Sequence, residues 1–298
     1  MMKAKILTPV VSIFKDDNSF DLDGNLRVME HLIKGGVDGI TPLGSTGEYP
    51  TIPFQQKKEY LDYYIDAVEK RVELLPGTGS ENAQDTIELS NHLFKHHRDQ
   101  IKGVLVISEF YFNMSDDDFY RYYAHMADAI DGPIYIYNYP ERTGHSISPD
   151  VVTILAKEKE NIVGIKESVK DFDHTRAILE KVKLVKPEFE VFSGYDNQHI
   201  ENVKLGGAGG IGALSNLQPQ LWAELMRAAN KGEYDKLDSF VPKIDKLMGL
   251  YALESNPQKI FKSLLNQQGI NVSTHCIFPF DYLKDGSLEK GMEIMNSI

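Results

Sequence analysis

One lysine lies in a stretch of the sequence that otherwise favours a buried strand. The segment from Asn161 to Ser168 reads Asn-Ile-Val-Gly-Ile-Lys-Glu-Ser, with Lys166 near its carboxyl end. Burying an ammonium group without a partner is so costly that the amine tends to lose its proton, and a neutral amine is a nucleophile. The ordinary alternative is a strand-end lysine that extends its amine into solvent. Which of the two holds depends on the side chains that the fold places around Lys166.

Alternation along this strand places Gly164 and Lys166 on one side and Glu167 on the other. If the first side faces the interior of the fold, Gly164 leaves space below the amine, and Glu167 is badly placed to pair with it. A free lysine has a pKa of about 10.4, and each unit by which burial lowers it raises the neutral fraction about tenfold. A lysine in this position can attack a ketone and form an imine.

Imine chemistry also needs a group that moves protons and a site that holds the substrate. Tyr137 ends another apolar segment, and its phenol can move protons if a second hydroxyl, from Ser45 or Thr46, relays them. The turn around these two hydroxyls, 44–47, also exposes successive backbone N–H groups, which suit a small carboxylate. Each feature has an ordinary interpretation, because tyrosines commonly fill protein cores and this turn is unremarkable alone. The functional interpretation therefore depends on their lying on one face.

Short β-rich segments alternate with amphipathic helical patterns as far as Gly232, which is typical of parallel β/α architecture. Eight strands with seven intervening helices, and an eighth helix from about Gln218, predict an α/β fold, a (β/α)8 TIM barrel, over residues 1–232. Three further helical stretches predict a C-terminal helical appendage over residues 233–298. The expected strands are 5–13, 39–43, 72–77, 103–108, 133–138, 161–168, 189–193 and 209–214, and the late helices are roughly 233–253, 257–268 and 285–297.

The functional face of such a barrel lies at the carboxyl ends of its strands. Lys5 lies at the beginning of its strand, so we expect it on the opposite, structural face. Polar and glycine-rich residues collect at the carboxyl ends, in the segments 44–48, 77–79, 137–144, 194–197 and 209–212, together with Tyr111 and Lys166. The predicted nucleophile, proton shuttle and hydroxyl turn are thus expected to meet at one end of the barrel.

The composition is that of an ordinary globular protein, with 42% hydrophobic and 26% charged residues in 298. A net charge of -12 argues against a nucleic-acid partner, which normally requires a basic face. Cys276 is the single cysteine and can form neither an internal disulfide nor a cysteine metal cluster, so we expect a cytoplasmic location. We expect neither secretion nor membrane association, because no signal-peptide pattern and no membrane-spanning apolar run occur.

Three motifs, in order and at these barrel positions, resemble one known family. They are Gly-Ser-Thr-Gly-Glu at 44–48, Tyr-Asn-Tyr-Pro-Glu-Arg-Thr-Gly at 137–144 and Gly-Ile-Lys-Glu-Ser at 164–168. They resemble the dihydrodipicolinate synthase / N-acetylneuraminate lyase family of pyruvate-dependent class I aldolases, and the resemblance extends into the tail at 254–257. It implies a carbon–carbon lyase or synthase that uses no metal and no cofactor beyond a covalent imine between pyruvate and Lys166.

The resemblance also implies roles for the other residues. Tyr137 would be the proton shuttle, and Ser45 or Thr46 would bind the pyruvate carboxylate and join the relay. Tyr111 would reach a neighbouring subunit's site as the third relay hydroxyl, and Ile211 would line the pyruvate pocket. The family is commonly a tetramer built as a dimer of dimers, so we expect a homotetramer or a homodimer.

The second substrate is indicated by residues that point in different directions. Arg142 is similar to the synthase branch, in which an arginine holds the carboxylate of aspartate semialdehyde, and this favours a synthase of lysine biosynthesis. In contrast, Ser45 replaces the usual threonine of the synthases. The loop from Gly194 to Asn197 resembles the sugar-acid lyases, where it recognises hydroxyl groups, although Asn197 replaces the glutamate of sialic-acid lyases.

We therefore expect a 4-hydroxy-tetrahydrodipicolinate synthase-like enzyme that condenses pyruvate with aspartate semialdehyde. The alternative is an aldolase, similar to N-acetylneuraminate lyase or 2-keto-3-deoxygluconate aldolase, that cleaves a 2-oxo-3-deoxy sugar acid to pyruvate and an aldehyde. A non-catalytic pyruvate-binding regulator would be expected to lack Lys166 or Tyr137, and both are present. We expect no feedback inhibition by lysine, because the matching positions do not reproduce the usual pocket; they are Tyr49, Pro50, Phe54, Glu81, Asp85 and Phe110.

Three other signals carry less weight. Residues 207–212 satisfy G-x-G-x-x-G but precede a strand, whereas a dinucleotide site joins a strand to a helix. That loop also lacks a basic residue, which disfavours a phosphate site there. His92 and His96 lie four apart on a predicted helix, a spacing that can bind a metal, but no carboxylate ligand is evident nearby, so a solvated helix end is favoured.

Overall fold

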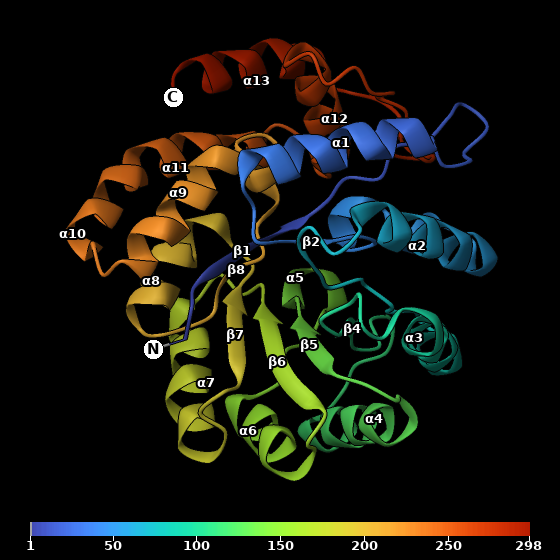
Figure 1. Cartoon of the computed structure of the whole chain (residues 1–298), viewed down its shortest axis with the longest axis vertical. Helices are drawn as coiled ribbons and strands as arrows, with labels where there is room; N and C mark the ends of the chain where they lie inside the picture. Colours follow the sequence, from blue (N-terminus) through green and yellow to red (C-terminus); the bar gives the residue numbers. More distant parts are fainter. Residues whose placement is uncertain (1) are drawn as a thin grey trace.

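The computed structural model describes residues 2–298 and has eight parallel strands at its centre (Figure 1). Their order is β3-β2-β1-β8-β7-β6-β5-β4. The two end strands are joined through their flanking residues, because the Lys102 N–H donates to the Leu74 carbonyl and the Leu105 N–H to the Pro76 carbonyl, both at 2.8 Å. The predicted (β/α)8 TIM barrel is confirmed. The strands are β1 (Lys5–Pro9), β2 (Gly39–Thr41), β3 (Glu73–Leu74), β4 (Val104–Ile107), β5 (Ile134–Asn138), β6 (Ile162–Glu167), β7 (Glu190–Ser193) and β8 (Gly209–Gly210).

Helices surround the strands, as Figure 1 shows. Several begin at a polar residue whose side chain accepts a hydrogen bond from a backbone N–H of the first turn, among them Asp21, Asn82 and Ser115. These caps fix where each loop ends and the return helix begins. The helices are α1 (Leu22–Gly35), α2 (Phe54–Val68), α3 (Ala83–His97), α4 (Asp116–Ala129), the short α5 (Pro140–Thr143), α6 (Pro149–Glu158), α7 (Phe172–Val185), α8 (His199–Lys204) and α9 (Pro219–Asn230).

The first and last strands are shorter than predicted. Beyond β1 the chain stays buried, but its N–H groups are bonded by side chains: Asn216 Oδ1 accepts from the Val11 N–H and Asn25 Oδ1 from the Ile13 N–H. Beyond β8 the chain turns into a 3-10 helix at Ala213–Asn216. Apolar residues occur in buried loops as well as in strands, so the hydrophobic pattern of the sequence could not show where the hydrogen bonds between strands end.

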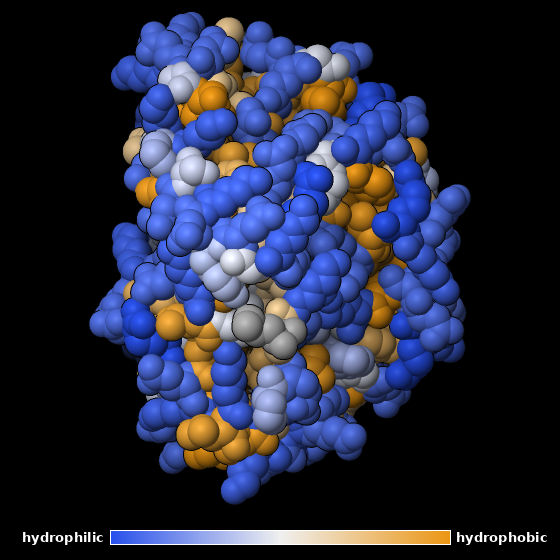
Figure 2. All heavy atoms as spheres, turned by 60° about the vertical axis from the view of Figure 1, so that its left-hand side comes forward, coloured by the Kyte–Doolittle hydropathy of each residue, from blue (hydrophilic) through white to orange (hydrophobic). Residues whose placement is uncertain are grey.

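The C-terminal region is helical, with α10 (Tyr234–Leu237), α11 (Val241–Met248), α12 (Gln258–Gln267) and α13 (Ser287–Asn296). Figure 1 shows α12 and α13 together at the end of the molecule that also carries α1. Within residues 2–298, none of the helices is long and apolar enough to cross a membrane. On the face shown in Figure 2, hydrophilic side chains cover most of the surface, and hydrophobic ones appear between them in patches.

The amino ends of the strands hold a cluster of paired charges. Lys5 Nζ lies 2.5 Å from Glu73 Oε1, and Lys102 Nζ lies 2.9 Å from Glu190 Oε2. The Tyr135 hydroxyl donates to Glu190 Oε2 at 2.5 Å. Burial lowers the pKa of Lys5, but the hydrogen bond and charge of Glu73, with Glu190, offset this and leave that pKa raised. Lys5 therefore lies at the opposite end of the barrel from Lys166, as predicted.

Candidate active site

A cavity of about 560 Å³ opens at the carboxyl ends of the strands. It is lined by Lys166, Tyr137, Ser45 and Thr46, so the structure brings the predicted nucleophile, shuttle and hydroxyl turn together. Tyr137 on β5 is in register with Lys166 on β6, which places both side chains on the same side of the sheet. The Lys166 Nζ atom lies 4.3 Å from the centroid of the Tyr137 ring.

Lys166 is buried, with 4% of its surface exposed, and no ion pair involves it within residues 2–298. Burial lowers its pKa to about 8, against the opposing charges of Tyr139 and Asp196. At that pKa about a tenth of the amine is neutral at pH 7, compared with well under one per cent for an exposed lysine. Glu167, the next residue, faces the other way and lies 3.0 Å from His174 Nδ1, so it does not neutralise the lysine.

Gly164 has a different role from the one expected. A Cβ at this position would lie 2.5 Å from the ring of Tyr135 and 2.6 Å from the Glu190 carbonyl oxygen. The space is therefore filled by the tyrosine of the neighbouring strand and does not lie open below the amine. The prediction that Gly164 makes room for Lys166 is wrong, because single-strand alternation does not show what the adjacent strand inserts.

Tyr137 is placed to hold and return a proton. Its hydroxyl lies 3.4 Å from the Ser45 hydroxyl. Burial raises the pKa of Tyr137, and hydrogen bonding by Ser45 and Ser168 opposes the rise. A phenol that stays protonated beside two hydroxyls can donate a proton in one step and recover it in the next. Sequence reasoning assigned no role to Ser168, although it ends the motif that carries Lys166.

The loop after β7 directs Asp196 into the cavity and leaves Asn197 at the surface. Gly194 lines the cavity, as does Ile211 beyond it, but Asn197 is exposed and is not among the lining residues. The reason is local: Asp196–Gln198 form a 3-10 turn that points successive side chains in different directions. The structure thus brings Gly194 and Ile211 to the site together with Asp196, which sequence reasoning had not named.

Asp196 is a buried carboxyl group that lines the cavity. Its Oδ2 accepts a 2.7 Å hydrogen bond from the Tyr251 hydroxyl, whereas its buried Oδ1 has no hydrogen-bond partner in the described chain. Burial raises the pKa of Asp196 to about 7, while the Tyr251 bond and the charge of Lys166 act in the opposite direction. His199 Nε2 is 3.8 Å from Oδ1, but burial lowers the pKa of His199 to about 3, so this histidine is neutral.

Three further charged residues lie at the mouth of the cavity. Arg142 Nη2 donates to the Ser255 carbonyl at 3.3 Å. Glu141, the preceding residue, accepts a hydrogen bond from the Tyr195 hydroxyl and pairs with Lys170. The hydrogen bonds lower the pKa of Glu141, so it is a carboxylate at neutral pH. The mouth therefore has two cations and one anion.

Besides Asn197, two other residues that the sequence singled out lie outside the cavity. Tyr111 is 82% exposed at the end of β4, and its expected role involves a second subunit. His92 is not simply solvated, because its Nε2 lies 2.9 Å from Asp62 Oδ1, an atom that also accepts from His97 Nε2 at 2.8 Å. Asp62 comes from α2, about 30 residues earlier, so the sequence around the histidines could not reveal this partner.

A buried lysine on the sixth strand of a TIM barrel, with no ion-pair partner within residues 2–298 and facing a tyrosine and a hydroxyl turn, is the arrangement of a class I, Schiff-base-forming lyase or synthase. Comparison gives the family. The model of the dihydrodipicolinate synthetase family matches residues 2–298, and the chain belongs to that family. Its members form a covalent Schiff base between pyruvate and a lysine and use pyruvate and aldehyde substrates.

The relatives include both aldolases and synthases. A protein of Escherichia coli K12 named "Putative 2-dehydro-3-deoxy-D-gluconate aldolase YagE" is 35% identical, over 92% of this chain and 90% of its own length. The 4-hydroxy-tetrahydrodipicolinate synthase of Kosmotoga olearia is also 35% identical, over 83% of each chain. The crystal structure of YagE with pyruvate matches with a TM-score of 0.93 and 32% identity, over 99% of each chain.

Proposed function

We propose that this enzyme is a Schiff-base aldolase that cleaves a 2-dehydro-3-deoxy sugar acid to pyruvate and an aldehyde. The observation that carries the proposal is that two acidic residues, Asp196 and Glu141, line the cavity, because carboxylate oxygens accept hydrogen bonds from hydroxyl groups. A sugar acid has its single carboxylate at the pyruvate end and hydroxyl groups beyond it. Similarity to YagE, named as an aldolase of such an acid, gives separate support.

In the proposed cycle the substrate carboxylate binds at the Ser45–Thr46 turn. The neutral amine of Lys166 attacks the C2 ketone, and Tyr137 donates the proton with which the C2 oxygen leaves as water, which gives the iminium and a Tyr137 phenolate. Tyr137 accepts the proton of the C4 hydroxyl, the C3–C4 bond breaks, and its electron pair moves into the iminium to give an enamine and the free aldehyde. The enamine takes up a proton at C3, and water then hydrolyses the resulting imine to release pyruvate and the Lys166 amine.

The second candidate is condensation of pyruvate with aspartate semialdehyde, the synthase reaction of lysine biosynthesis. Arg142 favours it, because this arginine lines the cavity where a carboxylate on the aldehyde half would lie. Aspartate semialdehyde carries such a carboxylate, whereas a sugar acid does not. Asp196 and Glu141 line the same cavity and suit hydroxyl groups better than a second carboxylate, so we favour the aldolase.

We also propose that the active enzyme is a homotetramer or a homodimer. Tyr111 and Phe112 are 82% and 71% exposed at the carboxyl end of the barrel. Such aromatic side chains are often buried against a partner chain. A neighbouring copy would cover them and receive the Tyr111 hydroxyl as the third member of the relay.

Substrate panels test the choice of reaction. Purified enzyme is given 2-dehydro-3-deoxy sugar acids while pyruvate release is followed, and pyruvate plus aspartate semialdehyde while condensation is followed. We expect cleavage to be faster, and Asp196→Asn to reduce cleavage more than Arg142→Ala does. Efficient condensation that Arg142→Ala abolishes would assign the enzyme to the synthases.

A further inference from the structure

The turn that carries Ser45 and Thr46 has a backbone that needs external support. Ser45–Gly47 form a single 3-10 turn, and it is flanked by Leu43 and Glu48, which have φ values of 54° and 59°. Residues other than glycine rarely adopt this left-handed backbone conformation. It persists at functional sites only where the surrounding structure holds it. The contacts of this segment therefore decide whether its two hydroxyls are placed correctly.

Helix α12 of the C-terminal region holds the turn at two points. The Gln258 side chain donates from Nε2 to the Ser45 carbonyl at 3.0 Å, and Lys262 donates from Nζ to Glu48 Oε1 at 2.5 Å. Gln258 and Lys262 are four residues apart and so lie on one face of the helix. One end of the turn is thus fixed by a neutral bond and the other by a charged bond from the same element.

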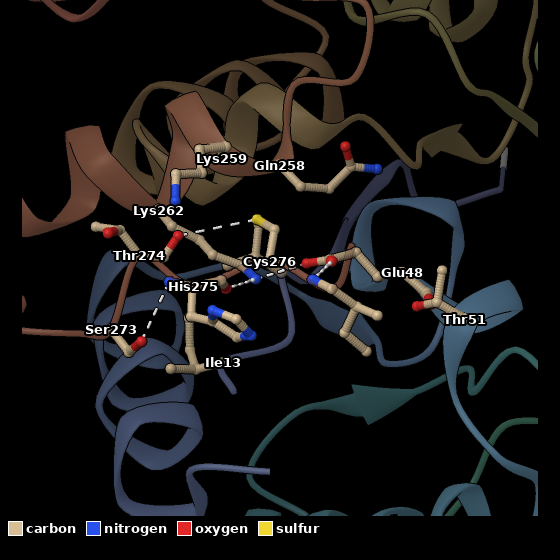
Figure 3. Close-up of polar contacts among 12 residues, drawn as sticks. Ile13, Glu48, Thr51, Gln258, Lys259, Lys262, Ser273, Thr274, His275 and Cys276 are labelled. Carbon is tan, nitrogen blue, oxygen red and sulfur yellow. Dashed lines mark hydrogen bonds and ion pairs between the residues drawn. The ribbon is translucent and has the colours of Figure 1, made fainter. Parts of the chain in front are cut away.

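The Glu48–Lys262 pair is buried and is held by further hydrogen bonds to the backbone. Lys262 has no exposed surface, and its Nζ also donates to the His275 carbonyl at 2.7 Å. The second oxygen of Glu48 accepts from the Ile277 N–H at 3.1 Å. Figure 3 shows Glu48 extending toward Lys262 and the 275–277 segment. Removing one member of a buried charged pair is costly, because it leaves the other charge uncompensated, so this pair fixes Glu48 firmly against α12.

We propose that Glu48 and Lys262 are positioning residues for pyruvate: the C-terminal helix α12, through this pair, holds the Ser45–Thr46 turn in the conformation that receives the carboxylate. The proposal depends on the carboxylate-binding role proposed for that turn. Lys262 is not among the residues that line the cavity, so within the described chain any effect of Lys262 on pyruvate binding passes through the turn. The C-terminal region thereby completes a site whose chemistry lies in the barrel.

The test is borohydride trapping of pyruvate on Lys166 over a range of pyruvate concentrations, read by mass, with thermal midpoints measured alongside. We expect Lys262→Met to raise the half-saturating pyruvate concentration roughly 10- to 100-fold and to lower the thermal midpoint. The double variant Glu48→Gln/Lys262→Met removes both charges and should regain stability while pyruvate binding stays weak. A loss of stability with unchanged pyruvate dependence in Lys262→Met would overturn the positioning role.

Lys5→Met is the matched control, because it removes a lysine paired at 2.5 Å at the other end of the barrel. It should lower stability without changing the pyruvate dependence. If Lys262→Met does not fold, the milder Glu48→Gln is measured in its place, and wild-type pyruvate dependence in that variant would overturn the proposal. If the wild-type enzyme carries no pyruvate label on Lys166 after borohydride treatment, the proposed Schiff-base function is itself wrong.

Discussion

The two ends of the barrel bury lysines with opposite results. At the amino end Lys5 lies against Glu73, and its pKa is raised despite the cost of burial. At the carboxyl end Lys166 has no paired carboxylate within residues 2–298, and burial lowers its pKa to about 8. Burial alone therefore does not make a lysine reactive. What matters is whether the fold places an anion beside the ammonium that offsets the cost of its burial. Glu48 provides such an anion for the fully buried Lys262.

The largest expected effect comes from removing the unpaired lysine. Lys166→Met should reduce turnover by roughly 10⁴-fold or more, because it removes the amine that forms the imine. Pyruvate release and the mass of the borohydride adduct measure this. Lys102→Met, which removes a lysine paired with Glu190, should keep most of the activity. If both variants lost activity to a similar extent, the two ends of the barrel would not differ in function as described.

The same strand offers a matched pair of tyrosines. Tyr137 faces Lys166, whereas Tyr135 donates to Glu190 at the structural end. Tyr137→Phe should slow turnover by about 10²- to 10⁴-fold, since it removes the proton shuttle. Tyr135→Phe should act on the thermal midpoint and leave kcat within about twofold. A normal rate in Tyr137→Phe would show that another group moves the protons.

The pH dependence should separate the two lysines as well. Trapping at subsaturating pyruvate requires the neutral amine of Lys166, so its rate should rise about tenfold per pH unit and level off above about pH 8. The charge of Asp196 raises that pKa, so Asp196→Asn should move the inflection to lower pH. Lys5→Met should leave the profile in place. An inflection near pH 10 in the wild type would contradict a depressed pKa.

The smallest effect concerns stability at the structural end. Lys5→Met should lower the free energy of unfolding by about 1 to 3 kcal/mol, because Glu73 loses its nearer partner in a partly exposed site and keeps only Lys102, at 3.4 Å, within residues 2–298. The pKa of Lys5 is raised above 10.5, so its contribution is present below that pH and is lost as the pH rises through the raised pKa. Denaturant titration at pH 7 and above pH 10.5 measures both points.

The sequence by itself determined the barrel and the centre of the site. Alternation of β and helical patterns predicted eight strands, and the position of each residue along its strand predicted that Lys166, Tyr137 and the Ser45–Thr46 turn share one face. These features are local or repeat along the chain, so periodicity is enough to find them. Motif resemblance added the family, which the comparison of residues 2–298 shows.

Only the tertiary structure decided which side chains surround that centre. The 3-10 turn at Asp196–Gln198 places Asp196, and not Asn197, among the residues that line the cavity. The ring of Tyr135, on the neighbouring strand, fills the space beside Gly164. Glu48 and Lys262 are 214 residues apart, and the sequence around neither residue indicates that the two form a pair. Such partners are set by the packing of distant elements, which hydrophobic periodicity does not specify.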